Sequence, residues 1–185
     1  MKLKNLDFRF ENTPVKIIAN RNHPEIKLAG ITIGPLQEGN EYELHYWVAQ
    51  ELANQGIVHF REEDTLDASK LNKIQWKERI QVAGQISELP EEFYPKLRRY
   101  LQTAKEEIIK HPELAKVQEY ERAKQTACDI VNSRLKKIVT LSSGPTQTDQ
   151  ITKKLTKEEK QIYLQLSKSV NEYRTKILQN EGQLP

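Results

Sequence analysis

The chain has 185 residues, 37% of them hydrophobic and 30% charged, with a formal net charge of +3. This composition is polar for one compact globule and suits long helices with wide solvated faces, whose thin core is usually completed by another subunit. The charge is spread without a basic arm or a dense Lys/Arg block, which argues against strong duplex binding and leaves weak single-strand contact at most. A lone cysteine, Cys128, excludes an intrachain disulfide and a cysteine-based zinc site.

The chain shows neither a signal-peptide pattern nor a membrane-span pattern. Its first residues, Met1 to Asn5, lack the apolar core of a signal peptide. No apolar run approaches the roughly 20 residues that a spanning helix needs. We therefore expect a soluble intracellular protein without membrane contact.

The first 39 residues are expected to form a small β-rich domain. Residues 6–33 hold three apolar pieces: Phe8 with Phe10, Val15 to Ile18, and Ile26 to Ile33. Alternation, β-branched residues and prolines at positions 14 and 24 favour three or four short strands, a sheet that is marginal alone. The Gly34-Pro35 break predicts a boundary. We expect a β-rich domain at 1–39 and an α-helical bundle domain at 40–185, so the fold class is mainly α, or α+β overall.

The helical region is expected to open at Glu41. One face of this first helix, which ends near Gly56, carries Leu44, Trp47, Val48 and Leu52. A short extended piece at residues 57–60 follows. Asp67 or Ser69 caps a second helix that bears Trp76 and ends at Gly84.

A third helix begins near Leu89-Pro90 and stops at His111-Pro112, with Pro95 tolerated in its first turn. Its predicted buried stripe consists of Phe93, Leu97, Leu101, Ala104 and Ile108. The last helix opens with a capping box, Thr156 to Glu159. Its apolar face consists of Ile162, Leu166, Val170, Tyr173 and Ile177.

A fourth helix, residues 113–141, shows a seven-residue apolar rhythm. The rhythm consists of Leu114, Val117, Cys128, Val131, Leu135 and Ile138. Glu121 and Lys124 interrupt it, which favours a bundle helix over a continuous coiled coil. We expect replacement of Leu135 by Ala to cost about 2–5 kcal/mol, as for a buried leucine.

The residues that we expect in the core or at a subunit interface lie on these apolar faces. They are Leu44, Trp47, Val48, Leu52, Phe93, Leu97, Val131, Leu135, Ile138, Leu166, Val170 and Tyr173.

The sequence offers little for chemistry. The four histidines are scattered, and the phosphate-loop, dinucleotide and serine-hydrolase motifs are absent. Residues 142–144 could form an anion-binding nest, but a plain loop is the favoured interpretation. Residues 62–64 could hold Mg²⁺, but acids that face solvent before a helix are favoured. Cys128 is expected to be a small buried residue rather than a nucleophile. We predict no catalytic residue, no cofactor and no metal site, and hence a protein that is not an enzyme.

The order of several short patterns carries a family resemblance. They are Gly34-Pro35; Glu43-Leu44, Trp47, Ala49 and Leu52; Ile57 to Phe60; Lys70 to Arg79; Leu89-Pro90, Phe93-Tyr94 and Leu97; Asp129, Arg134, Lys137 and Ile138; Leu155-Thr156, Glu159, Tyr173-Arg174 and Leu178. From about Ile26 to Leu178 the chain resembles a GINS subunit, of the type that carries its β-domain first (the Psf-two and Psf-three branch), as found in archaea.

The resemblance implies a non-catalytic scaffold in DNA replication. GINS subunits form heterotetramers with a sister GINS subunit, and the complex links the MCM replicative helicase to a RecJ-like partner, with weak or indirect DNA contact. The implied location is the cytoplasm with the nucleoid in an archaeon, or the nucleus in a eukaryote.

The alternative interpretation is a helical adaptor that binds single-stranded nucleic acid. Trp47 and Trp76 can stack on bases, and Lys73, Lys77 and Arg79 accompany Trp76. Trp47 shares a face with leucine and valine, which favours packing for that ring.

Overall fold

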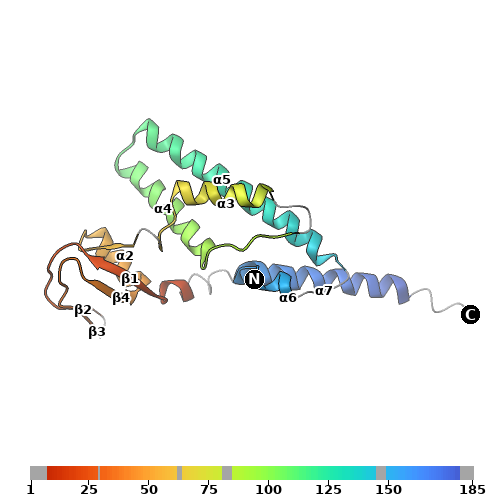
Figure 1. The fold of residues 1–185 in the computed structure, drawn as a ribbon, viewed down its shortest axis with the longest axis horizontal. Coiled ribbons are helices and arrows are strands. Elements are labelled where there is room, and N and C mark those ends of the chain that lie inside the picture. The colour runs from red at the N-terminus through yellow and green to blue at the C-terminus, as the bar shows by residue number, and fades with distance from the viewer. Residues whose placement is uncertain (1–7, 29, 62–63, 81–84, 145–148, 180–185) are drawn as a thin grey trace, which may run out of the picture. The chain divides into compact units, whose positions relative to one another are not determined.

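The computed structural model describes residues 8–28, 30–61, 64–80, 85–144 and 149–179. The chain folds as two compact units, Lys2–Leu66 (the N-terminal unit) and Asp67–Pro185 (the helical unit). Within the described residues, no helix is long and apolar enough to cross a membrane. Along the chain, the strands and short helices of the N-terminal unit come first, and the helical unit follows (Figure 1).

The N-terminal unit is built around β1 (Pro14–Ala19). β1 lies between β4 (Glu41–His45) and β5 (Val58–Phe60) in a three-stranded antiparallel sheet, and β2 (Ile26–Leu28) pairs with β3 (Ile31–Ile33) as a hairpin. The short helix α2 (Tyr46–Asn54) follows β4 directly. The expected boundary after residue 39 differs from the observed division, because both β4 and β5 pair with β1.

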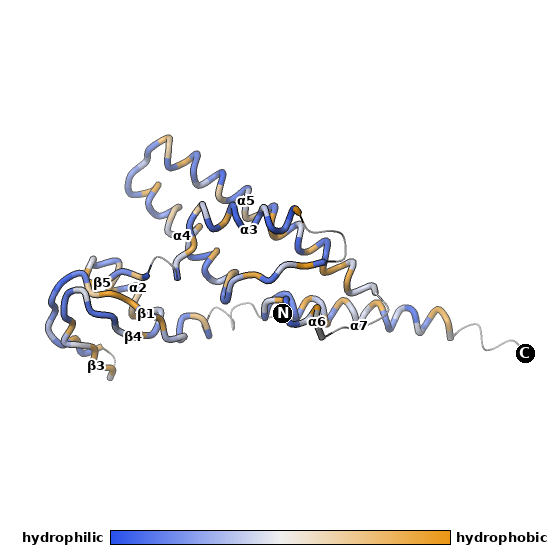
Figure 2. Tube along the Cα trace, in the orientation of Figure 1, coloured by the Kyte–Doolittle hydropathy of each residue, from blue (hydrophilic) through white to orange (hydrophobic). Residues whose placement is uncertain are grey.

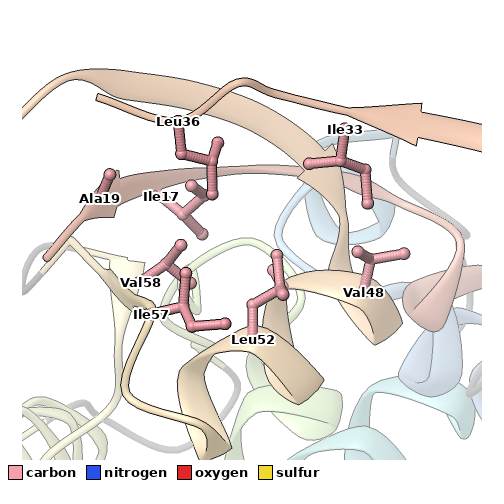
Figure 3. Packing of buried hydrophobic residues seen from close by; sticks show 9 residues of the cluster. Ile17, Ala19, Ile33, Leu36, Val48, Leu52, Ile57 and Val58 are labelled. Carbon is pink, nitrogen blue, oxygen red and sulfur yellow. The ribbon is translucent and has the colours of Figure 1, made fainter. Parts of the chain in front are cut away.

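One apolar cluster holds the N-terminal unit together. In Figure 3 the side chains of Val48 and Leu52 point from α2 toward the strand side of the cluster, where Ile17 and Ile33 lie. The buried members are Ile17, Ala19, Ile33, Leu36, Val48, Ala49, Leu52, Ile57 and Val58. Alternation along β1 puts Ile17 and Ala19 on one face, and helical spacing puts Val48 and Leu52 on one face.

Two predicted elements in this unit are wrong. Residues 8–11 are helical rather than extended, and Phe10 is buried against the Tyr46 ring at a centroid distance of 4.5 Å while Phe8 is exposed. Glu41 to His45 form a strand rather than the start of a helix. Tyr42 and Leu44 are half-buried between exposed neighbours, the period of two that a strand requires. The prediction instead placed Leu44 on a helical face.

Ile17 gives a stability test of this cluster, because its side chain is fully buried. We expect Ile17→Val to lower the free energy of unfolding of the N-terminal unit by about 0.5–1.5 kcal/mol. Urea unfolding followed by Trp47 fluorescence, in a Trp76→Phe background, reads this unit alone. Ile31→Val, at a side chain 36% exposed, is the matched control and should cost less.

The helical unit is arranged around α5 (Leu114–Ser142). α3 (Ala68–Ile80), α4 (Phe93–Lys110) and α7 (Lys157–Gln179) each contact α5, and α6 (Asp149–Lys153) is a short helix before α7. α4 and α5 form an antiparallel hairpin in Figure 1, with His111 to Glu113 between them. The predicted stop at His111-Pro112 is confirmed, and Pro95 lies in the first turn of α4.

Two predicted helix starts are confirmed by hydrogen bonds. The Lys70 N–H donates to Asp67 Oδ1 at 2.8 Å at the start of α3. At α7 the capping box is reciprocal, since the Thr156 N–H donates to Glu159 Oε2 at 3.0 Å and the Glu159 N–H donates to Thr156 Oγ1 at 3.3 Å. The predicted end of the α3 helix, at Val82 and Gly84, lies outside the described residues.

The buried line of α5 differs from the predicted rhythm. It consists of Ala123, Ala127, Ile130, Arg134 and Ile138, with Ser142 at the end. Of the predicted set only Ile138 is buried, and Cys128 is exposed rather than buried. Leu135 is 43% exposed, so the expected cost of 2–5 kcal/mol for Leu135→Ala, which assumed full burial, does not apply. The buried line was not predicted because it includes alanines and an arginine, which do not belong to a pattern of large apolar residues.

Candidate interaction surface and the buried charges beside it

The inner face of α5 carries a fully buried arginine. Arg134 donates from Nε to Glu159 Oε1 at 2.5 Å and from Nη2 to Glu159 Oε2 at 2.8 Å, which is a bidentate pair with α7. Its Nη1 atom bonds the Glu78 carboxylate on α3 and donates to the Ser87 carbonyl at 3.0 Å. One guanidinium therefore joins α3, α5, α7 and the segment before α4.

The two carboxylates have further partners, and together these residues form the buried charge cluster. Lys137 Nζ donates to Glu78 Oε2 at 2.7 Å and to the Glu78 carbonyl at 2.8 Å. The Ser87 hydroxyl bonds the same carboxylate, and Tyr94 on α4 donates its hydroxyl to Glu159 Oε1 at 2.6 Å. Two acids and two bases thus compensate each other inside the helical unit, as buried ions must.

The cluster shifts the pKa values of its members. Burial raises the pKa of Glu78, but hydrogen bonds from Lys137 and Ser87 and the charges of Arg134 and Lys137 outweigh burial and hold that pKa below its ordinary value. Burial, followed by the charge of Glu159, raises the pKa of Tyr94, which stays protonated and donates. The cluster therefore keeps Glu78 ionised and Tyr94 neutral at physiological pH, an arrangement that positions helices.

The lowered pKa of Glu78 makes the helical unit sensitive to acid. A carboxylate whose folded pKa lies below its unfolded value contributes stability above the unfolded pKa, near 4.5, and loses it as the pH falls through the folded pKa. We expect the urea midpoint of the helical unit to fall as the pH drops below about 4.5. Glu78→Gln should flatten this dependence, whereas Glu106→Gln, on the exposed side of α4, should leave it intact.

One flank of α5 beside the buried line carries exposed apolar side chains. Cys128 is exposed, and Val131, Leu135 and Val139 are 37%, 43% and 45% exposed. Their spacing of three or four residues places them on one side of the helix, and we call this row the α5 stripe. It extends over about 16 Å of helix axis. Surface rows of this kind mark contacts with other proteins.

The apolar face of α7 continues into the C-terminal half of the helix, where it is exposed. Tyr163 is buried and Leu166 and Val170 are half-buried, but Tyr173 and Ile177 on the same face are 67% and 53% exposed. Every residue from 171 to 178 is exposed, and Leu178 is 66% exposed. Hydrophobic segments recur along the whole of α7 in Figure 2. We call Tyr173 and Ile177 the distal α7 face.

The residues that the sequence predicts for core or interface separate into two groups. The buried ones are Val48, Leu52, Phe93, Leu97 and Ile138. The half-buried or exposed ones are Leu44, Trp47, Val131, Leu135, Leu166, Val170 and Tyr173. The structure brings Val131 and Leu135 together on the α5 stripe, and their place at a subunit interface stays a prediction.

The roles of Arg134 and Glu78 were not predicted from the sequence. Arg134 lies four residues after Ile130 and four before Ile138, so a charge on the inner line of α5 was the available signal. The sequence assigns Glu159 a structural role only in the capping box of α7. Its second bond, to a residue 25 positions away, has no signature in a local pattern.

The weak candidates for chemistry have ordinary surroundings in the described residues. No group of three or more His, Cys, Asp or Glu side chains that are described lies close enough to hold a metal ion. Asp64 bonds Arg61, and Glu62 and Glu63 lie outside the described residues. The N–H groups of Ser143 and Gly144 donate to carbonyls of the last turn of α5, so they do not form a nest.

The described residues thus combine a β-containing unit with a helical unit that exposes apolar rows on α5 and α7. Two family models match the chain: the GINS complex protein helical bundle domain at residues 64–178 and the PSF2 N-terminal domain at residues 2–59. The gap between these matches lies just before the observed division at Leu66 and Asp67. No curated protein matches the chain significantly.

The chain belongs to the GINS family, as a PSF2-like subunit of the DNA replication complex. Membership implies association with other GINS subunits. The family resemblance and the fold class predicted from the sequence are thereby confirmed.

Proposed function

We propose that this chain is a non-catalytic scaffold that joins a sister GINS subunit in a heterotetramer, and that the complex links the MCM helicase to a RecJ-like partner at replicating DNA. The α5 stripe carries this proposal, because it is a row of exposed apolar residues on the best-anchored helix of the unit. Burying such a row against a partner removes apolar surface from water, and this stabilises the complex by roughly 25 cal/mol for each Å² buried.

The anchoring of α5 supports a role in assembly. Arg134 and Lys137 fix this helix to α3 and α7 through Glu78 and Glu159. A rigid helix presents its outer flank without an ordering cost on binding, which favours affinity. The buried charges are occupied with one another, so they hold the bundle and supply no reactive group to a substrate.

The distal α7 face supplies a second contact. Its exposed tyrosine and isoleucine continue a face that is buried earlier in the same helix. A subunit with two apolar surfaces can contact more than one neighbour, as a heterotetramer requires.

Cys128 provides the test, because it is the sole cysteine and lies on the α5 stripe. We expect maleimide to label Cys128 readily in the free chain and at least about tenfold more slowly in the complex with the sister subunit, since thiols at a buried interface are shielded. The control is Cys128→Ser/Lys136→Cys, which moves the thiol to another exposed side of α5. Equal labelling of Cys128 in the free chain and in a complex verified by native mass spectrometry would contradict the proposed interface.

The links to MCM and the RecJ-like partner have a separate test. We expect the assembled GINS complex to retain the RecJ-like protein on immobilised MCM, and the two proteins not to associate when the complex is omitted. Retention without the GINS complex would contradict the linking role and leave the sister contact unaffected.

A further inference from the structure

The outward side of α3 combines an exposed indole with lysines. The helix turns Leu71, Ile74 and Glu78 inward, and these three side chains are buried. On the other side Trp76 is 63% exposed, and Lys73 and Lys77 are exposed beside it. We call Lys73, Trp76 and Lys77 the α3 patch.

The patch is positive and has no acidic neighbour on its own helix surface. Glu78, the one acid in α3, is buried in the charge cluster. Among the described residues, Lys73 and Lys77 make no ion pair, whereas Arg79 is bonded to Asp129 at 3.0 Å. The charge that α3 itself presents to solvent around Trp76 is therefore cationic, and it complements an anionic ligand.

The patch is also held rigidly. Gln75 and Arg79 both donate to Asp129 on α5, at 2.9 and 3.0 Å, and Glu78 bonds Arg134 and Lys137. These bonds fasten the inner side of α3 to α5. The indole and the two lysines thus project from a fixed helix, with Lys73 and Lys77 about 6 Å apart along its axis.

We propose that the α3 patch binds single-stranded DNA, with Trp76 stacked on a base and Lys73 and Lys77 on neighbouring phosphates. An exposed ring flanked by cations is the arrangement by which proteins hold single strands without sequence preference. A duplex offers no free base face to the ring, and an acidic peptide has no flat group that requires it. DNA replication, the process of this family, exposes single strands. The proposal does not depend on the sister-subunit interface.

Fluorescence of the full chain tests the site, because Trp47→Phe leaves Trp76 as the sole tryptophan. We expect oligo(dT) to quench Trp76 at low salt. The binding constant should fall with salt by a log–log slope of about −0.7 for each phosphate contact, and Lys73→Ala or Lys77→Ala should each remove about 0.7 from the slope. In the chain with both tryptophans, Trp76→Ala should weaken binding roughly 5- to 150-fold, and Trp76→Phe much less; anisotropy of labelled oligo(dT) reads these two variants.

Matched controls separate the patch from general charge. Lys73→Glu/Lys77→Glu should abolish binding, whereas Lys105→Glu/Lys110→Glu, the same charge change on exposed residues of α4, should retain most of it. Circular dichroism confirms that each variant is folded. Equal losses in the two double variants, or no response of Trp76 to oligo(dT), would overturn the proposal. Displacement by poly-glutamate as effective as by oligo(dT) would point to an acidic protein segment and also overturn it.

Discussion

Replacing Arg134 by methionine is expected to destabilise the helical unit by about 3–5 kcal/mol, because the change leaves two buried carboxylates without their shared partner. Arg134 is fully buried, and the side chains of Glu78 and Glu159 are 1% and 3% exposed. Neither acid can recover its lost bonds from water. Urea unfolding followed by Trp76 fluorescence, in a Trp47→Phe background, measures the change within the unit that contains the cluster.

The control for this prediction is Arg79→Met. Arg79 also pairs with a carboxylate on α5, but its side chain is 65% exposed, and such pairs contribute at most about 1 kcal/mol. Adding Glu159→Gln to Arg134→Met should recover part of the loss, since Glu159 loses its cationic partner in the single variant, whereas Glu78 keeps Lys137 at 2.7 Å. A cost for Arg134→Met no larger than that of Arg79→Met would show that the buried charge cluster does not hold the unit.

Replacing Leu135 by glutamate is expected to abolish assembly with the sister subunit while the chain remains folded. Leu135 is 43% exposed, so water solvates a carboxylate there in the free chain. In the proposed interface the same carboxylate would be buried without a partner, and a change at such a central residue costs 2 kcal/mol or more, about thirtyfold in affinity. Native mass spectrometry of the co-expressed subunits measures the loss.

Lys136→Glu is the matched control for Leu135→Glu. It introduces the same side chain at the next position of α5, which is exposed and off the α5 stripe. We expect this variant to assemble normally. If Leu135→Glu assembles as well as Lys136→Glu, the stripe does not carry the contact. If Leu135→Glu fails to fold alone, its Trp76 unfolding curve reports that directly, and Val131→Ser then tests the same surface with a milder change.

Local chemistry predicted some of the helix ends, although the helix expected to begin near Leu89-Pro90 begins at Phe93. A proline without an N–H stops α4 at His111, and Thr156 with Glu159 closes the first turn of α7, because these effects act within a few residues. Glu41 to His45 was harder. Its alternating pattern is short, and the pairing with β1 that makes it a strand is a long-range contact.

The buried face of α5 is a second case in which a local pattern did not predict the long-range packing. Val131 and Leu135, which the pattern placed in the core or at an interface, lie on the exposed flank of this helix, whereas its buried line combines Ile130 and Ile138 with small alanines and Arg134. A pattern of large apolar residues does not distinguish this flank from the buried line, because both carry such residues. The sequence therefore predicted that α5 carries apolar residues for packing, but not which of its rows is buried by other helices of this chain.

Glu159 has one further consequence, for how this sequence can change over generations. Its carboxylate both closes the first turn of α7 and receives the guanidinium of Arg134, so no other residue type serves both tasks equally well. Positions 78, 134 and 159 should therefore covary among orthologous sequences, and an alignment of such sequences would test this without any purified protein.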